Sequence, residues 1–177
     1  MGTRIDANER DITGMSSVNL TVRPLEDADR PWLAERTRAW WGGDHVECTD
    51  GMYEPVLLPG LVAIVDGEPV GAVTWSIADN QMQIITVNSE HEGVGIGTAL
   101  LGSAVSLARG EKLRRVWLTT SNDNLHALGF YQKRGFVLAA LHVNIMEQHR
   151  KRKPQIPMVS DNGIPIRDEI ELEMLLG

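Results

Sequence analysis

The order of apolar and polar positions along the chain predicts alternating strands and helices. Two-residue alternation or a short apolar run, which is typical of strands, occurs in residues 18–23, 61–66, 70–77, 81–88, 113–119 and 136–143. Helical spacing, together with residues that start and stop helices, occurs in residues 27–41, 95–109, 121–134 and 144–151. Residues 169–176 alternate strictly between apolar side chains and glutamates, which predicts a half-exposed final strand. The succession of elements predicts an α/β fold.

The length of the chain fits a single domain, because two halves of 177 residues would each have a poor core. Residues 1–17 are polar and lack periodicity, so we expect a flexible N-terminal extension before one domain at 18–177. Two stretches are expected to be irregular. They are residues 42–55, rich in acids and turn formers, and residues 154–165, which contain three prolines.

The chain is acidic, with 17 Lys and Arg against 24 Asp and Glu and a formal net charge of −7. This balance disfavours nucleic-acid binding, which needs a basic face, and suits a cationic substrate. The single cysteine, Cys48, excludes an internal disulfide and fits a reducing compartment. No run approaches the ~20 apolar residues of a membrane span, the first residues lack a secretion signal, and the histidines lack metal-ligand spacing. We expect a cytoplasmic protein without a metal, membrane or nucleic-acid partner.

A glycine-rich turn follows the strand 81–88 and opens the helix 95–109. Its sequence, EGVGIG over residues 92–97, places backbone N–H groups and the positive end of a helix dipole where an anion binds. No Lys-Ser/Thr pair follows, so the turn is not a P-loop, and the hairpin-like strands before it do not fit a dinucleotide-binding fold. The turn is either a phosphate cradle or an ordinary strand–helix connection.

Asn124 and Tyr131 are seven residues apart in the predicted helix 121–134. At ~100° per residue they lie on one helix face, roughly 10 Å apart. A tyrosine phenol, with a pKa of ~10, keeps its proton at neutral pH and can give it to a more basic leaving group. The alternative is a tyrosine that packs on the core with its hydroxyl at the surface.

Two motifs together resemble the GNAT family of acyl-CoA-dependent N-acyltransferases. The central signature of that family is Gln/Arg-x-x-Gly-x-Gly/Ala. Here Gly95 and Gly97 fill its last two positions, whereas Glu92 stands at the first position in place of Gln or Arg. This departure keeps the cradle of backbone amides but removes one cationic or amide contact to the cofactor. A second family feature, Asn-x-x-Ala-x-x-Phe-Tyr-x-x-x-Gly-Phe, is matched in full by Asn124, Ala127, Phe130, Tyr131, Gly135 and Phe136. The resemblance extends from residue 18 to the C-terminus.

The resemblance implies the GNAT fold, a mixed and mostly antiparallel central sheet flanked by helices, with acetyl-CoA as co-substrate. It places the pantetheine arm along 84–87, where the strand is splayed from its neighbour, and a thioester-polarising N–H near Val87. Asn124 is expected to hold the pantetheine arm, and Tyr131 to protonate the leaving thiolate; these two are the expected catalytic residues. The expected cofactor-binding residues are Ile85, Val87, Gly93, Val94, Gly95, Ile96, Gly97, Thr98, Asn124 and Tyr131.

The sequence leaves the proton acceptor for the substrate amine open. Relatives often carry a glutamate on the strand before the glycine turn, where this chain has Gln83, which takes no proton. Water is one alternative, and the side chains considered are Glu90, His91, His142, Glu147, Asp44, Glu47 and Glu54. The loop acids Asp44, Glu47, Asp50 and Glu54, with nearby aromatic rings, either bind a polycationic acceptor or are solvated. The expected acceptor-binding residues are Trp41, Asp44, His45, Glu47, Tyr53, Gln83 and His142.

The expected activity is transfer of an acetyl group from acetyl-CoA to a primary amine of a small molecule, by direct attack in a ternary complex. An aminoglycoside-like amino sugar, as in antibiotic resistance, is the expected acceptor. Two alternatives stay open: a protein or peptide N-acetyltransferase, and a non-catalytic acyl-CoA-binding module. The basic run 149–153 either contacts the CoA 3′-phosphate or nucleic acid, or is a solvated helix end. A homodimer formed through the exposed final strand and the tail is also considered.

Overall fold

The computed structural model describes residues 19–91 and 93–177. The expected N-terminal extension at 1–17 and the signature position Glu92 lie outside the described residues. The strands are β1 (Leu20–Pro24), β2 (Val46–Cys48), β3 (Gly51–Tyr53), β4 (Gly60–Val65), β5 (Glu68–Ala78), β6 (Gln81–Ser89), β7 (Arg115–Ser121), β8 (Val137–His142) and β9 (Glu169–Leu175). The helices are α1 (Arg30–Trp41), α2 (Ile96–Gly110), α3 (Leu125–Gln132) and α4 (Ile145–Arg152), with 3-10 turns η1 (Asp27–Asp29) and η2 (Pro55–Leu57).

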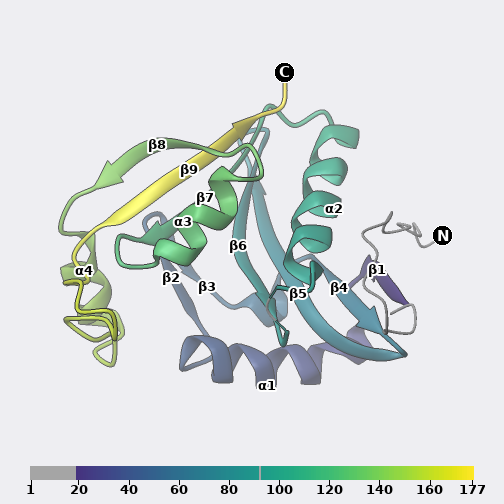
Figure 1. Ribbon diagram of the computed structural model, residues 1–177, viewed down its shortest axis with the longest axis horizontal. Coiled ribbons are helices and arrows are strands. Elements are labelled where there is room, and N and C mark those ends of the chain that lie inside the picture. The colour runs from purple at the N-terminus through teal and green to yellow at the C-terminus, as the bar shows by residue number, and fades with distance from the viewer. Residues whose placement is uncertain (1–18, 92) are drawn as a thin grey trace.

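Seven strands form the central sheet in the order β1-β4-β5-β6-β7-β9-β8 (Figure 1). All neighbouring pairs are antiparallel except β6 and β7. The predicted fold class, a mixed and mostly antiparallel sheet flanked by helices, is therefore confirmed. Among the described residues, no helix is both long enough and apolar enough to cross a membrane.

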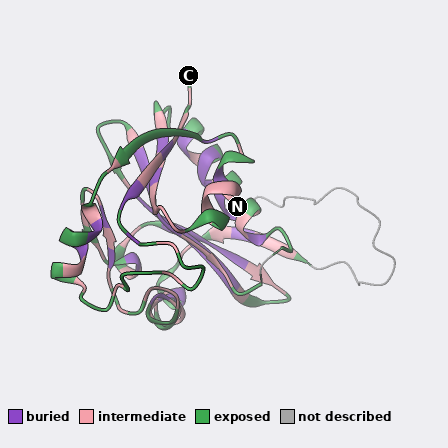
Figure 2. Cartoon of the chain, turned by 60° about the vertical axis from the view of Figure 1, so that its left-hand side comes forward, coloured by how far each residue is buried: buried purple, intermediate pink, exposed green. Residues whose placement is uncertain are grey.

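The main hydrophobic core lies between the sheet and helix α2. Leu100 and Ala104 of α2 are completely buried and pack in one cluster with Val73 of β5 and Met82 of β6. Each of the larger side chains, Leu100, Val73 and Met82, contributes about 1.5–3 kcal/mol through its burial. Figure 2 shows the buried residues along the middle strands and on the inner side of α2. We call this side of the sheet the α2 face; α3 joins its core through Tyr131.

The opposite side of the sheet carries the β2–β3 hairpin, and we call it the hairpin face. A second small cluster there joins Val46 and Cys48 of β2 with Ile85 of β6. Trp41 at the end of α1 and Tyr53 of β3 pack against this cluster. The hairpin and α1 therefore cover the middle of the sheet from this side.

Strands β6 and β7 form a fork. Their ladder has three residue pairs, from Gln81 opposite Arg115 to Gln83 opposite Trp117, after which the two strands separate (Figure 1). The register between β5 and β6 also shifts, so that Ile85 of β6 opposes no residue of β5. A bulge of this kind bends a strand and leaves a residue outside the ladder. The closed end of the fork is at Gln83, and its open end faces α3.

Three expectations about the elements are wrong. The stretch 42–55 contains the β2–β3 hairpin, whose three-residue strands are too short to show a pattern. The helix expected at 121–134 begins later, because Ser121 still belongs to β7 and Asn124 is the N-cap of α3. The final strand is not free to pair across subunits through its edge, because β9 is hydrogen bonded to β7 and β8. The edge strands of the sheet are β1 and β8, and Leu138 and Leu141 of β8 are exposed.

Candidate active site

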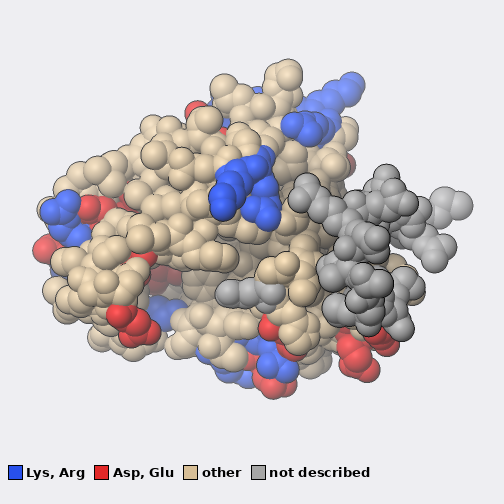
Figure 3. All heavy atoms as spheres, viewed as in Figure 1, with Lys and Arg blue, Asp and Glu red and all other residues tan. Residues whose placement is uncertain are grey.

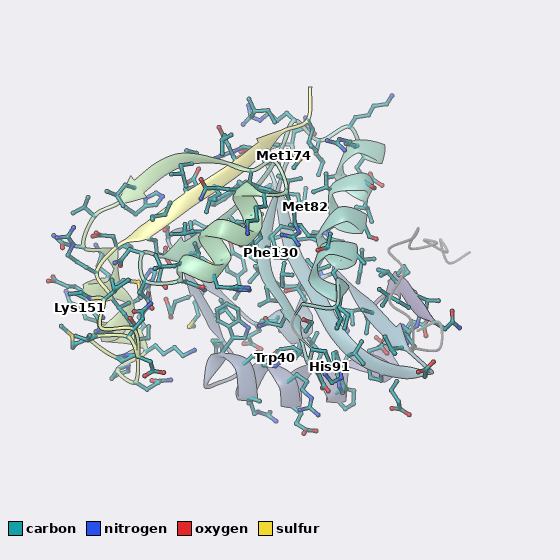
Figure 4. All side chains as sticks on the ribbon, in the orientation of Figure 1. Trp40, Met82, His91, Phe130, Lys151 and Met174 are labelled. Carbon is teal, nitrogen blue, oxygen red and sulfur yellow. The ribbon has the colours of Figure 1, made fainter. Side chains whose placement is uncertain are left out.

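A cleft of about 930 Å³ opens between the end of β6, the start of α2 and helix α3. Its walls are Val87–Ser89, His91, Gly93, Gly95–Thr98, Asn124–Ala127, Gly129–Tyr131, Lys133 and Arg134. Figure 3 shows the hollow on this face of the molecule, with basic side chains above it. Figure 4 labels Phe130 of α3 and His91 of the loop after β6, which come from two sides of the cleft. The cleft therefore occupies the open end of the fork.

The glycine turn forms one end of this cleft. Gly93 and Gly95 have φ values of 77° and 89°, a backbone region that side chains with a Cβ rarely adopt. Gly95 is the N-cap of α2, whose first N–H groups have no partner within the helix. A Cβ on Gly97 would lie 3.4 Å from the ring of Phe130, so the missing side chain lets α3 approach α2. The turn thus presents backbone amides to the cleft, as an anion site requires.

Arg134 adds a positive charge beside the turn. Its Nε lies 3.1 Å from Oγ1 of Thr98, and its Nη1 donates to the carbonyl of Phe130 at 2.7 Å. The guanidinium stacks 3.6 Å above the Phe130 ring, and burial lowers its pKa. Sequence reasoning missed this residue. The Lys-Arg pair that precedes Gly135 in the sequence could have indicated a cation near the end of this helix.

Asn124 and Tyr131 both line the cleft, from opposite ends of α3. Asn124 Oδ1 accepts the N–H of Ala127 at 3.0 Å and so caps the helix. The Tyr131 ring packs against Phe130 and Phe136 at 5.1 and 5.7 Å between centroids. Burial raises the pKa of Tyr131 far above its ordinary value, so its hydroxyl keeps the proton at neutral pH.

Eight of the ten expected cofactor-binding residues line the cleft, and two do not. Val94 lies beside it and is 62% exposed. The side chain of Ile85 is buried on the hairpin face with Val46 and Cys48. Only the backbone of Ile85 is therefore available to a ligand in the fork.

Tyr53 and Gln83 meet at the closed end of the fork, and Asp50 joins them. The Tyr53 hydroxyl donates to Asp50 Oδ2 at 2.6 Å and lies 3.1 Å from Gln83 Oε1. The Gln83 amide, which belongs to a residue only 3% exposed, donates to Asp50 Oδ1 at 2.8 Å. Burial and the bond to Asp50 raise the pKa of Tyr53 to about 12. The three side chains form a closed triangle.

The other expected acceptor-binding residues are spread over the hairpin face. Trp41 Nε1 donates to Asn88 at the rim of the cleft, at 2.9 Å, and His142 lies 3.1 Å from Glu171. The remaining three have partners away from the triangle. Asp44 with Arg38 and His45 with Glu54 lie at the surface, whereas the carboxylate of Glu47, which pairs with Arg152, is buried. The structure thus brings Tyr53 and Gln83 together and leaves the acidic loop residues apart.

The basic run 149–153 does not reach the cleft residues. Arg152 pairs with Glu47, and Lys153 Nζ donates to the carbonyls of Trp41 and His45. Arg150 donates to the carbonyls of three residues in the loop after α4, at Ile156, Pro157 and Ile166. The run ties α4 to the hairpin face and its own loop.

A buried ionisable pair lies beneath the hairpin turn. Glu169 of β9 is 5% exposed and accepts a hydrogen bond from the hydroxyl of Thr49. His149 of α4 is 1% exposed, and its Nδ1 lies 3.6 Å from the Glu169 carboxylate. Burial raises the pKa of Glu169 and lowers that of His149, because it disfavours the charged form of each. Sequence analysis considered His149 only as part of the basic run 149–153 and assigned no role to Glu169.

Comparison with known proteins gives a consistent result. The model of the acetyltransferase (GNAT) family matches residues 22–136. The uncharacterized protein YdhI of Bacillus subtilis (strain 168) is 41% identical over 152 residues, 85% of this chain and 95% of that protein. The uncharacterized protein YxbD of the same strain is 43% identical over 133 residues, 75% and 84% of the two chains. Streptothricin acetyltransferase of Streptomyces lavendulae is 34% identical over 80 residues, 43% of this chain and 42% of that protein.

The fold gives the same answer. A GNAT family acetyltransferase from Elizabethkingia anophelis, solved with acetyl-CoA bound, superposes with a TM-score of 0.67 at 20% identity, over 89% of this chain and 99% of the other. The family match covers well over half of the described chain. The protein therefore belongs to the GNAT family of acetyltransferases, enzymes that use acetyl-CoA as acetyl donor.

Proposed function

We propose that this chain transfers the acetyl group of acetyl-CoA to a primary amine of a small polycationic molecule, an amino sugar or a polyamine. The observation that carries the acceptor class is the carboxylate of Asp50 beside the fork, which is paired with no cation among the described residues. The acids of β9 on the same side of the sheet are already paired, because Glu171 and Glu173 both contact Arg115, which lies over the Trp117 ring. An exposed carboxylate without a cation favours a positively charged ligand.

The cleft is proposed to hold acetyl-CoA. The N-terminus of α2 offers its amides to the pyrophosphate, and Arg134 adds a cation beside them. Along β6, residues 84–87 line the fork where β7 no longer pairs with them, which leaves backbone groups for the pantetheine arm. Asn124 Nδ2 donates to none of the described residues, so it is available to a pantetheine carbonyl.

The acetyl thioester supplies the activated carbonyl, and the chain provides its surroundings. Ile85 opposes no residue of β5, and β7 no longer pairs with β6 at this position. The N–H of Ile85 is therefore the proposed donor to the thioester carbonyl. Val87 lies two residues further along β6. Tyr131 keeps its proton and offers it to the leaving sulfur. The amine attacks directly, so the chain contributes mainly positioning and proton transfer.

The acceptor class is tested by release of CoA thiol from acetyl-CoA. The amines are kanamycin, spermidine, lysine and a short peptide with a free N-terminus. We expect turnover with kanamycin or spermidine, because Asp50 offers them a carboxylate that no cation of the described residues occupies, and little with the peptide. Turnover of the peptide alone would replace the proposal with a peptide N-acetyltransferase. Binding of acetyl-CoA without turnover of any amine would favour an acyl-CoA-binding module.

The role of Tyr131 is tested by Tyr131→Phe. The loss of the proton donor is expected to lower kcat by about 100-fold. The dissociation constant of acetyl-CoA, measured by calorimetry, should change little, because the buried ring and its packing stay in place. An unchanged kcat would remove Tyr131 from the mechanism.

A further inference from the structure

The closed end of the fork lacks an ionisable side chain on β6 itself. Gln83 occupies it, two residues before Ile85 and so about 7 Å along the strand. An amide neither holds an ammonium as a counter-ion nor takes its proton. The carboxylate that touches Gln83 comes instead from the turn of the hairpin, at Asp50.

The hydrogen bonds around Asp50 fix its carboxylate. One oxygen accepts the Gln83 amide and the other accepts the Tyr53 hydroxyl, at 2.8 and 2.6 Å. Both partners are neutral donors, and the raised pKa of Tyr53 shows that the phenol keeps its proton in this bond. Asp50 itself is exposed to solvent. The arrangement holds a carboxylate in place while leaving it within reach of a ligand.

The turn that carries Asp50 spans the fork. Asp50 contacts Gln83 on β6, whereas its neighbour Thr49 donates to Glu169 on β9. Strand β7 lies between these two strands in the sheet. The turn therefore crosses over the end of β7 on the hairpin face, where an acceptor beside the thioester would sit.

Each of the other acids of the stretch 42–55 has a basic side chain beside it. Asp44 pairs with Arg38, Glu47 with Arg152 and Glu54 with His45. The titratable groups that face Asp50 from the packed elements are Tyr53 of β3, Glu169 of β9 and Cys48 of β2, whose thiol stays protonated because burial raises its pKa. No cation is paired with Asp50 within residues 19–91 and 93–177.

We propose that Asp50 is a catalytic residue that binds the ammonium group of the acceptor at the fork and takes a proton from it, held in position by Gln83 and Tyr53. The inference rests on the proposed acetyltransferase function and assigns the base that the sequence left open. A carboxylate from the hairpin turn thus supplies at this place what Gln83 lacks.

The proposed acetyl transfer conserves protons and bonds. The acceptor enters as R–NH₃⁺, and Asp50 takes one proton to leave R–NH₂. The nitrogen lone pair forms the C–N bond to the acetyl carbon, and the C–S bond breaks with its electrons going to sulfur. Tyr131 gives a proton to the thiolate and regains one from the second proton lost by nitrogen. Asp50 releases its proton to solvent, so one proton is produced with each acetamide and CoA thiol.

The test compares Asp50→Asn with Asp66→Asn, a matched change in the exposed turn between β4 and β5. With spermidine or kanamycin as acceptor, we expect Asp50→Asn to lower kcat/KM by about 100-fold or more. Asp66→Asn should behave as the wild type. Calorimetry with acetyl-CoA and thermal unfolding confirm that both variants fold and bind the donor.

Each outcome decides the proposal. A kcat/KM for Asp50→Asn within about threefold of the wild type overturns it, and so does a rise in acceptor KM with kcat unchanged. If the wild type binds acetyl-CoA yet acetylates no amine, the proposed function fails separately. Spermidine is then titrated into the CoA-loaded wild type and Asp50→Asn. Binding heat that Asp50→Asn loses supports the ammonium contact, and equal or absent heats overturn it.

Discussion

Asn124 serves two purposes at the level of a single side chain. Its Oδ1 closes the first turn of α3 by accepting the Ala127 N–H, while its Nδ2 has no hydrogen-bond partner among the described residues and the residue lines the cleft. The family resemblance predicted a ligand-binding asparagine at this position. The structure adds that the same residue starts the helix that carries Tyr131.

The two roles of Asn124 can be separated by substitution. Asn124→Ala removes cap and donor, so we expect it to lower the free energy of unfolding by about 1 kcal/mol and to weaken acetyl-CoA binding. Asn124→Asp keeps a good cap and removes only the amide donor. Urea unfolding should therefore leave Asn124→Asp near the wild type, while calorimetry shows weaker acetyl-CoA binding. Equal affinity in Asn124→Asp and the wild type would contradict a contact from Nδ2.

At the scale of elements, the start of α2 depends on close contact with β5 and β6. A Cβ on Gly71 of β5 would lie 2.8 Å from the carbonyl oxygen of Asn88 and 3.0 Å from Cγ2 of Ile96. Neither neighbour is the free end of a flexible side chain. Gly71 therefore fixes the distance between the sheet and the helix whose N-terminus forms the phosphate cradle.

Gly71→Ala tests this packing, with Gly102→Ala as control. The first change is expected to cost about 1–3 kcal/mol of unfolding free energy, because the strand and helix must move apart. Gly102 lies on the exposed side of α2 with nothing within 4 Å of an added Cβ, so Gly102→Ala should stabilise by up to about 1 kcal/mol. Chemical denaturation measures both. A neutral Gly71→Ala would show that the contact is not tight.

The sequence alone predicted the long periodic elements and most of the residues that line the cofactor cleft. The helix at 95–109 and the strands at 61–66 and 81–88 follow from local pattern, and the structure places them within one or two residues. Most of the residues carried over from the two motifs line one cleft, because a glycine turn and a helix start are encoded locally.

The contacts on the acceptor side of the site could not be predicted from the sequence in the same way. The contact between Asp50 and Gln83 joins residues 33 positions apart, and that between Thr49 and Glu169 joins residues 120 apart. Neither contact has a signal in the local sequence, because each depends on where the β2–β3 hairpin packs on the sheet. The same reason explains the error about β9, since its alternation predicts a strand and does not say which strands flank it.

At the scale of the whole molecule, His149 and Glu169 connect α4, the sheet and the hairpin. His149 faces Glu169 at 3.6 Å, and its other charged neighbours are Glu47 and Arg152. The net effect of these surroundings is a lowered pKa, with burial as the largest cause. Because the folded state favours the neutral imidazole, the unfolded state binds more protons below pH ~6.5.

The stability of the whole fold should therefore depend on pH through this histidine. A lowered pKa contributes stability above the unfolded value of ~6.5, and that contribution is lost as pH falls through the folded pKa. We expect the advantage of the wild type over His149→Gln in unfolding free energy to be larger at about pH 7.5 than at about pH 5.5. Urea unfolding at the two pH values measures it. A difference that does not change with pH would mean that His149 titrates equally in both states.

The position of β9 in the sheet determines when β8 can pair during synthesis of the chain. β9 follows β8 in the chain but lies between β7 and β8, so β8 has no strand partner until Glu169–Leu175 has been synthesised. The cleft residues lie between Val87 and Arg134 and emerge from the ribosome earlier. A nascent chain paused before β9 carries the residues of the donor site together with an apolar, unpaired β8, whose Leu138 and Leu141 are then free to bind chaperones or to aggregate.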